Sequence, residues 1–263
     1  MSSSGESLSV AQVRSMLHAA DERELTKLIR RFADDDRAGV ADACERAVAR
    51  LAALHSERRR TDGLYELERS LQATGFVAVA GVDEVGRGAL AGPVSAGAVI
   101  LLPGSPIERL NDSKKLSPAR REELALIIHQ HAVAVGIGHV SAMEIDAMGL
   151  SAALRKAMHI ALSQLVPTPD HVIVDGLALG IHASETAVVK GDSKIAAVAA
   201  ASIVAKVARD ALMREAALTH PAYGFDVNKG YGTAEHIAAV AQLGPCVLHR
   251  QTFCGGGGNP TLF

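Results

Sequence analysis

The chain has 263 residues, 27 Lys and Arg against 29 Asp and Glu, and a formal net charge of -2 at pH 7. Hydrophobic residues make up 48% of it, which is enough for a large buried core in a globular protein. The even balance of charge excludes a protein that binds nucleic acid through bulk positive charge, so any phosphate-binding surface has to be local.

Residues 1–72 are expected to form a small helical N-terminal domain. From residue 8 to about residue 70, apolar residues recur at three- and four-residue spacings, and no strand signal interrupts them. The acidic run 34–36 and the stretch 58–63 predict breaks between short helices. Helical periodicity does not distinguish a packing or solubility extension from a nucleic-acid-binding domain, so both interpretations stay open.

Strand and helix patterns alternate in the rest of the chain. The β-rich runs 76–83 and 94–102 flank a glycine loop, which predicts a hairpin-like start. Further strands are predicted over 132–140, 171–175 and 187–190, and helices over 117–130, 143–166 with a break near Gly149, and 193–218. The alternation predicts a layered α/β domain with a mixed sheet over residues 73–254. Residues 255–263 are expected to form a flexible, glycine-rich tail.

Cysteine usage and hydropathy bear on the compartment. Cys44, Cys246 and Cys254 lie far apart with no CxxC spacing, which argues against a disulfide framework and against a zinc site. The longest apolar run, 195–205, is too short to span a bilayer, and residues 1–30 lack the apolar core of a signal peptide. We therefore expect a cytoplasmic protein that does not contact a membrane.

Four acidic residues fall at the ends of predicted strands or at the start of a predicted helix. They are Asp83, Glu84, Asp175 and Asp192. An ionised carboxylate beside a buried strand is costly unless it is paired or binds a cation. Oxygen ligands alone favour Mg²⁺ or Mn²⁺ over zinc, and three or four converging carboxylates could hold two such ions for phosphodiester hydrolysis.

This interpretation carries a geometric condition. Adjacent strand residues point to opposite faces, so Asp83 and Glu84 serve one site only if the strand ends there and the backbone turns. The glycines that follow supply such a turn. Taken singly, each acid is better explained as a helix cap or a surface carboxylate, and Asp192 stands where an N-cap would.

Three further segments offer contacts to a nucleic acid. The loop Gly86-Arg87-Gly88 presents backbone amides that can approach a sugar or phosphate closely, although a GxG without a following helix is not a dinucleotide fingerprint. Ser113 and Lys114 precede a helix and provide a donor and a cation, with a solvated loop as the bland alternative. Tyr231, in a glycine-rich loop, suggests a ring that stacks on a base or sugar. His249 and Arg250 either contact phosphate or lie on the surface.

A series of motifs resembles bacterial ribonuclease HII across residues 73–254. The segment 80–88, followed by 90–94, looks like the signature of that family. Further matches, in the same order along the chain, are 112–116, 174–176, 191–194, 200–206, 223–225 and 229–233. One departure is Asn228, which stands where the family often has histidine and leaves one substrate contact open.

The resemblance implies an RNase H-like fold, with a central mixed sheet flanked by helices. It implies a site of four carboxylates, Asp83, Glu84, Asp175 and Asp192, with two Mn²⁺ or Mg²⁺ ions held mainly by the first three. It also implies that the Gly86-Arg87-Gly88 loop reads the 2′-hydroxyl and that Tyr231 stacks on the following sugar, while Ser113 and Lys114 contact the substrate.

The activity that the resemblance implies is endonucleolytic. Such an enzyme hydrolyses the RNA strand of RNA/DNA hybrids and incises duplex DNA on the 5′ side of embedded ribonucleotides, leaving 3′-hydroxyl and 5′-phosphate ends. The implied role is the removal of misincorporated ribonucleotides from DNA. We expect a monomer. The terminal Leu262 and Phe263 resemble the end of a short peptide that binds a sliding clamp, although the expected glutamine is missing.

Three other functions compete with this interpretation. A different two-metal nuclease on the same fold would also cleave all-DNA duplex. A catalytically silent hybrid-binding protein would bind without metal and without cleavage. A serine hydrolase, suggested by Gly191-Asp192-Ser193, is excluded because the sequence has neither a Gly-x-Ser-x-Gly elbow nor an assignable triad histidine.

Overall fold

The computed structural model describes residues 8–254 and divides the chain into two compact units, residues 1–60 and residues 61–263. Residues 61–72, which the sequence pattern groups with the N-terminal domain, belong to the second unit. There the helix α4 (Glu66–Ala73) contacts the first strand of the sheet. None of the described helices is both long enough and apolar enough to cross a membrane.

The first unit is helical, as its periodicity predicts. It contains α1 (Val10–Ala19), α2 (Glu22–Arg31) and most of α3 (Ala38–Leu64). Its core residues come from all three helices: Val13, Leu17, Leu25, Phe32, Val40, Ala43 and Ala47. The predicted break at 34–36 is confirmed, but the one at 58–63 is wrong because α3 continues through it. An ion pair between Arg60 and Glu57, at 2.7 Å and one helical turn apart, stabilises the helix there.

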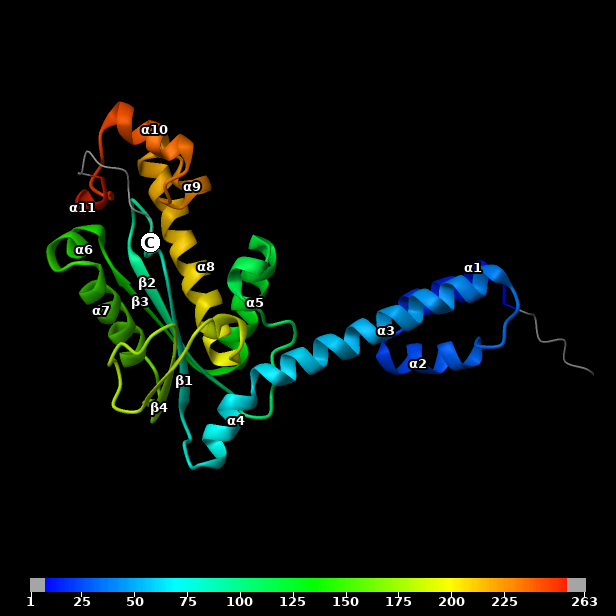
Figure 1. The fold of residues 1–263 in the computed structure, drawn as a ribbon. Helices are drawn as coiled ribbons and strands as arrows, with labels where there is room; N and C mark the ends of the chain where they lie inside the picture. Colours follow the sequence, from blue (N-terminus) through cyan, green and yellow to red (C-terminus); the bar gives the residue numbers. More distant parts are fainter. Residues whose placement is uncertain (1–7, 255–263) are drawn as a thin grey trace, which may run out of the picture. The chain divides into compact units, whose positions relative to one another are not determined.

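A five-stranded mixed sheet forms the centre of the second unit, and the predicted fold class is confirmed (Figure 1). The strands are β1 (Val79–Val85), β2 (Val94–Leu101), β3 (Ala132–Val140), β4 (His171–Asp175) and β5 (Glu185–Val188), in the order β3-β2-β1-β4-β5. The first three strands pair antiparallel, whereas β4 pairs parallel with both β1 and β5. Sequence placed β5 two residues too late, and it ended β1 two residues too early.

Helices cover both faces of this sheet. On one face α8 (Ala196–Thr219) contacts β1 and β2, and α5 (Pro118–His131) contacts α8. On the other face α7 (Leu150–Ser163) contacts β2 and β3, following α6 (Ala142–Met148). The helix α5 begins as predicted, with the Ser117 hydroxyl accepting a hydrogen bond from the Arg120 amide at 3.3 Å. The remaining helices are α9 (Phe225–Asn228), α10 (Ala234–Leu243) and α11 (Gln251–Cys254).

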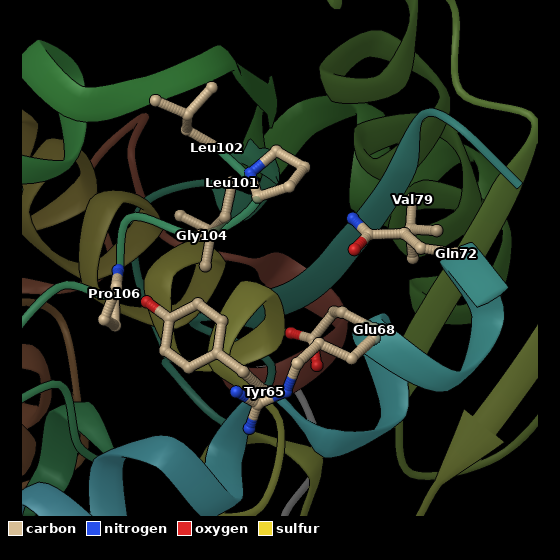
Figure 2. Close-up of a pocket in the computed structure, with 10 residues that line it drawn as sticks. Tyr65, Glu68, Gln72, Val79, Leu101, Leu102, Gly104 and Pro106 are labelled. Atoms are coloured by element: carbon tan, nitrogen blue, oxygen red, sulfur yellow. The ribbon is translucent and has the colours of Figure 1, made fainter.

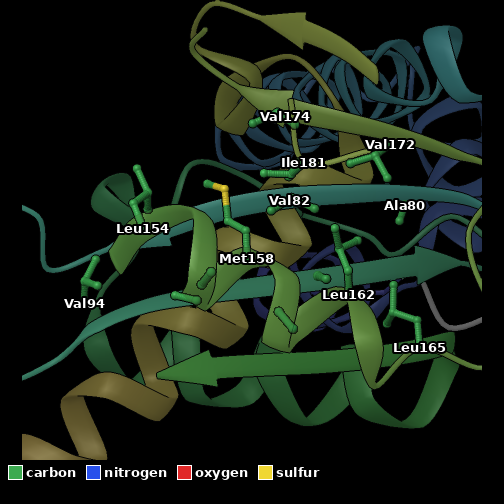
Figure 3. Packing of buried hydrophobic residues seen from close by; sticks show 14 of the residues in the cluster. Ala80, Val82, Val94, Leu154, Met158, Leu162, Leu165, Val172, Val174 and Ile181 are labelled. Atoms are coloured by element: carbon green, nitrogen blue, oxygen red, sulfur yellow. The ribbon is translucent and has the colours of Figure 1, made fainter. Parts of the chain in front are cut away.

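The two faces are packed differently. The α7 face is a layer of larger apolar side chains (Figure 3), including Val82, Val94, Leu154, Met158, Leu162, Val172 and Val174. On the α8 face the helix lies directly against the strand backbone. A Cβ atom on Gly81 would stand 2.2 Å from the carbonyl carbon of Ala197, and one on Gly97 would stand 2.3 Å from the Ala201 oxygen. Glycine in the strands and alanine in α8 therefore bring the helix close to the strand backbone.

Candidate active site

Asp83 and Asp175 lie side by side on neighbouring strands. The parallel register of β1 and β4 places Val82 opposite Val174, so the next residue of each strand is an aspartate. Side chains alternate along a strand, which puts both carboxylates on the face that α8 covers, as it covers Gly81. Two acids whose spacing in sequence is 92 residues therefore meet at one edge of the sheet (175 − 83 = 92).

The Asp83 carboxyl is buried, and its hydrogen bonds offset only part of the cost of removing its charge from water. Its residue is 5% exposed, and its Oδ1 accepts a hydrogen bond from the Glu84 amide at 2.8 Å. Burial, followed by the charge of Glu84, raises the pKa of Asp83 to about 8, against the lowering effect of a hydrogen bond from Ser202. The Ser202 hydroxyl also lies 2.8 Å from the Ser113 hydroxyl. A chain of hydroxyls from α8 and the loop before α5 therefore supports this carboxyl.

The strand β1 does not end at Asp83, which was the condition for Asp83 and Glu84 to share one site. The strand β1 continues past it, pairing Glu84 with Ala96 and Val85 with Ser95, and the backbone turns only at Gly86, where φ is 88°. Glu84 therefore follows Asp83 in the regular alternation of the strand. Its Oε1 accepts a hydrogen bond from Arg87 at 3.0 Å. Burial raises the pKa of Glu84, although the bond from Arg87 lowers it in part.

Asp192 lies in a short turn, η2 (Gly191–Ser193), just before α8. It is 5% exposed, and its Oδ2 stands 3.3 Å from the Lys114 ammonium. Burial and the charge of Asp112 raise the pKa of Asp192, while Lys114 opposes them. The alternative that Asp192 caps α8 is wrong, because the N-cap position is Ile195.

Asp175, Asp192 and Lys114 line one surface pocket. Its other lining residues are Asp112, Lys115, Lys190 and Ser193. The Asp175 Oδ1 accepts a hydrogen bond from the Gly191 amide at 2.6 Å, which ties the end of β4 to the turn that carries Asp192. Acids and lysines share this pocket, so it offers oxygen ligands for a cation and positive charge for a phosphate.

The carboxylate oxygens are suitable ligands for a divalent cation, but their present arrangement does not form a complete coordination site among the described residues. Within residues 8–254 no group of three or more His, Cys, Asp or Glu side chains is arranged to hold a metal ion. The donors are all oxygens, and the neighbouring charges of Glu84 and Asp175 both raise the pKa of Asp83. A cation among these groups would relieve that repulsion. The assignment of Asp83, Glu84 and Asp175 as metal ligands stays a prediction.

The structure brings the expected 2′-hydroxyl loop and the expected stacking ring together. Gly86-Arg87-Gly88 begins the connection from β1 to β2, and Ala89 in that connection forms a β-bridge with Tyr231. The Tyr231 ring has two cations over it, with Lys206 Nζ 5.6 Å and Arg209 Cζ 5.2 Å from its centroid. Ser113, by contrast, is 4% exposed with its hydroxyl turned to Ser202.

Sequence reasoning missed several side chains of this region. Ser202 sits within a run of apolar residues, and nothing local indicates that it faces a carboxyl. His249 and Arg250, expected to contact phosphate or to lie on the surface, are instead 2% and 0% exposed, so that interpretation is wrong. Arg209 was not singled out, and it is also 0% exposed. Burial of arginine is rare enough that only the tertiary structure reveals it.

Comparison with known families gives two matches that together span most of the chain. The family model described as Ribonuclease HII matches residues 80–255. A second model, described as Ribonuclease HII N-terminal domain, matches residues 9–72.

Individual relatives agree with the family models. A ribonuclease HII of Moorella thermoacetica is 54% identical over 198 residues, which is 75% of this chain and 96% of the relative. A ribonuclease HII of Bacillus licheniformis is 39% identical over 248 residues, which is 94% of this chain and 97% of the relative. The second match includes the helical N-terminal unit.

Solved structures share the fold of the second unit. The ribonuclease H2 of Pyrococcus horikoshii OT3 has a TM-score of 0.58 at 28% identity, covering 67% of this chain and 93% of that one. The chain matched in a PCNA:RNase HII complex from Archaeoglobus fulgidus has a TM-score of 0.56 at 28% identity, covering 66% and 94%. Bst-RNase HIII in complex with Mn²⁺ has a TM-score of 0.52 at 16% identity over 67% of each chain, a likeness of fold alone.

Proposed function

Because the chain belongs to the ribonuclease HII family, we propose that it hydrolyses the RNA strand of RNA/DNA hybrids and also incises duplex DNA on the 5′ side of embedded ribonucleotides. The products would be 3′-hydroxyl and 5′-phosphate ends. The observation that carries the proposal is the meeting of Asp83 and Asp175 at the ends of adjacent strands. In the cell this activity would remove misincorporated ribonucleotides from DNA.

Although β1 continues past Glu84, the pKa of Glu84 is raised by burial and also by the charge of Asp175, so this carboxyl lies near the other acids. Asp83, Glu84 and Asp175 would hold Mn²⁺ or Mg²⁺, with Asp192 completing the set of catalytic carboxylates. Two such ions, when bound, would supply an activated water and stabilise the leaving oxygen. The chain itself orients the carboxyls: Ser202 and the Glu84 amide hold Asp83, and the Gly191 amide holds Asp175. The Mn²⁺ complex of Bst-RNase HIII supports a divalent metal in this fold.

Substrate selection would depend on the loop beside the acids. The 2′-hydroxyl is the group that separates RNA from DNA at a single nucleotide, and backbone amides at Gly86-Arg87-Gly88 can approach it closely. Tyr231, joined to this loop by the bridge at Ala89, would stack on the sugar that follows. The Lys114 side chain, which is 81% exposed, would contact the phosphate backbone. Ser113 would contact the substrate only after its hydroxyl breaks the hydrogen bond with Ser202.

The test is incubation with a labelled DNA duplex that contains one ribonucleotide, in Mn²⁺ or Mg²⁺, beside an all-DNA duplex and a metal-free control. A metal-dependent nick only on the 5′ side of the ribonucleotide is the expected result. Cleavage of both duplexes would indicate a general two-metal nuclease. Binding without cleavage of either would indicate a silent hybrid-binding protein.

Two expectations about partners stay predictions. The clamp-binding peptide at Leu262 and Phe263 lies outside the described residues. The PCNA:RNase HII complex from Archaeoglobus fulgidus gives a reason to test it. Clamp binding that survives deletion of both residues would rule the peptide out. The monomeric state can be measured by light scattering.

A further inference from the structure

Two arginines are buried beside the candidate active site without a charged partner. Arg209 in α8 and Arg250 just before α11 are each 0% exposed, and neither forms an ion pair with a carboxylate in the described part of the chain. Burial lowers the pKa of both guanidinium groups, that of Arg250 to about 10. A buried cation without a counterion is costly, so its hydrogen bonds have to offset the lost hydration.

The Arg250 guanidinium donates hydrogen bonds to backbone carbonyls of the β1–β2 connection. Its Nη2 donates to Gly86 at 2.6 Å, and its Nη1 donates to Arg87 at 2.8 Å. Its Nε and Nη2 both donate to Gly92, at 3.1 Å and 3.0 Å. One planar guanidinium therefore holds both ends of the connection at a fixed separation.

Arg209 joins the same connection to the loop that carries the stacking ring. Its Nε donates to the Pro93 carbonyl at 2.8 Å and its Nη2 to the Ala91 carbonyl at 3.1 Å. Its Nη1 donates to the Lys229 carbonyl at 2.9 Å, two residues before Tyr231. The turn at Gly86 lies directly on this side chain, because a Cβ atom there would stand 2.3 Å from the Arg209 Nε.

Two buried histidines, His236 and His249, link the Tyr231 backbone to the residue next to Arg250. The His236 Nδ1 lies 2.8 Å from the Tyr231 carbonyl, and the His236 Nε2 lies 3.0 Å from the His249 Nε2. The Cys246 amide donates to the His249 Nδ1 at 3.0 Å. These contacts are satisfied together when both rings are neutral, with His236 donating to the carbonyl and His249 donating to His236. Arg250, next to His249, is thereby tied to Tyr231 through side chains as well as through the backbone.

We propose that Arg250 and Arg209 are positioning residues for selection of the ribonucleotide. By binding carbonyls of both segments, they set the separation between Gly86-Arg87-Gly88 and Tyr231 and so align the 2′-hydroxyl contact with the stacking contact. Neither guanidinium touches substrate in this role. The inference rests on the proposed function, in which those two elements read one nucleotide and the next.

Arg250→Lys and Arg209→Lys test the proposal. Lysine keeps the charge but replaces the rigid fork by a single ammonium, which cannot hold several carbonyls in one geometry. The readout is the ratio of kcat/KM on a duplex with one ribonucleotide to kcat/KM on a continuous RNA/DNA hybrid. A misplacement of about 1 Å costs up to about a hundredfold, and a hybrid offers many alternative registers. We therefore expect each variant to lower the ratio by about tenfold or more.

Two controls separate positioning from loss of folded protein. Arg50 also donates to two backbone carbonyls, those of His18 at 2.7 Å and Ala20 at 2.6 Å, but in the N-terminal unit. Met158→Ala removes a buried side chain from the α7 face and lowers stability without touching the loop. A lower folded fraction reduces both activities equally, so Arg50→Lys and Met158→Ala should leave the ratio unchanged.

The outcomes distinguish this inference from the proposed function. A ratio within about twofold of wild type in both lysine variants of the buried arginines, with normal nicking by wild type, would refute the positioning role alone. Wild-type protein that cleaves hybrids but never nicks at a single ribonucleotide would refute the proposed incision activity, and the positioning role with it.

Discussion

Among single residues, Asp175 is the one whose substitution tests whether cleavage can be lost while substrate binding is kept. It stands at the end of β4 beside Asp83, and its Oδ1 accepts a hydrogen bond from Gly191. Asp175→Asn keeps the size and one acceptor oxygen but removes a negative charge from the expected cation site. We expect hybrid cleavage to fall by at least about a hundredfold while hybrid binding persists.

Single-turnover cleavage and equilibrium binding of a labelled hybrid, both in Mn²⁺, measure these two quantities. Asp34→Asn, an exposed acid of the N-terminal unit, is the matched control for the loss of one charge. Full activity of Asp175→Asn would contradict the assignment of the carboxylates.

Residues of the site differ in how well sequence reveals them. Asp175 is visible because an acid at the end of an otherwise apolar strand demands a partner. Arg250 is not visible, because the carbonyls that it binds at Gly86 and Gly92 lie 164 and 158 residues away in the chain. Glu84 falls between these cases. The sequence shows that it follows Asp83, but only the register of β1 with β2 shows that the strand continues through Glu84.

At the scale of elements, the close packing of strands and helices rests on glycine. A Cβ atom on Gly138 in β3 would stand 2.0 Å from the Ala157 carbonyl oxygen in α7. Gly138→Ala therefore forces a shift of the helix backbone, and we expect it to destabilise the protein by about 1–3 kcal/mol. Gly63→Ala is the matched control, because no atom lies within 4 Å of its added Cβ in the helix α3. It should stabilise by about 0.5–1 kcal/mol.

Urea denaturation measures both changes. Equal stability of Gly138→Ala and wild type would show that β3 and α7 are less closely packed than described. A destabilised Gly63→Ala would show that α3 does not continue as a regular helix through this position.

The helix α4 supplies a second prediction at this scale, through Glu68 (Figure 2). Its Oε1 accepts a hydrogen bond from the Ala197 amide in the first turn of α8 at 2.8 Å, while its Oε2 has no hydrogen-bond partner in the described structure. Burial raises the pKa of this carboxyl above its ordinary value, against the lowering effect of the Ala197 bond. The folded state therefore binds the proton more tightly than the unfolded state does.

The sign of the pH effect follows from that raised pKa. The contribution of Glu68 to stability is fully present below the unfolded pKa, near 4.5, and is lost as pH rises through the folded value. Relative to Glu68→Gln, wild type should lose free energy of unfolding above that pH, by at most about 1.4 kcal/mol per pH unit. Urea midpoints of both proteins from about pH 4 to about pH 8 measure the difference. A difference that does not change with pH would show that the carboxyl is hydrated.

Elements with a strong periodic pattern could be predicted from the sequence, and those set by tertiary contacts could not. The helix at 117–130 and the strand at 132–140 match α5 and β3 closely, because Ser-Pro starts the helix and the β-branched run follows it. The break expected at 58–63 failed because Gly63 is a weak helix breaker within a long helix. The side chain that accepts a hydrogen bond from the first turn of α8 is Glu68, which lies 129 residues before its donor Ala197, so local sequence rules cannot predict it.

At the scale of the whole molecule, the open question is what the N-terminal unit does. Its helix α2 has four exposed cations at successive spacings of four, three and one residues, which place them on one side of the helix. They are Arg23, Lys27, Arg30 and Arg31, and none of them forms an ion pair within residues 8–254. Such a face fits a phosphate backbone, whereas a packing extension has no need of it.

Salt dependence decides between the two interpretations. Replacing all four cations by glutamine leaves the buried Leu25 and the unit's core intact. If the unit binds nucleic acid, hybrid affinity should fall and the slope of log K against log salt should weaken by about 0.9 for each lost duplex phosphate contact. Hybrid titrations from about 50 to 200 mM salt measure that slope. Charges that contact the substrate release counterions on binding, whereas charges that only face solvent do not. An unchanged slope together with unchanged cleavage would therefore show that the unit has a packing or solubility role.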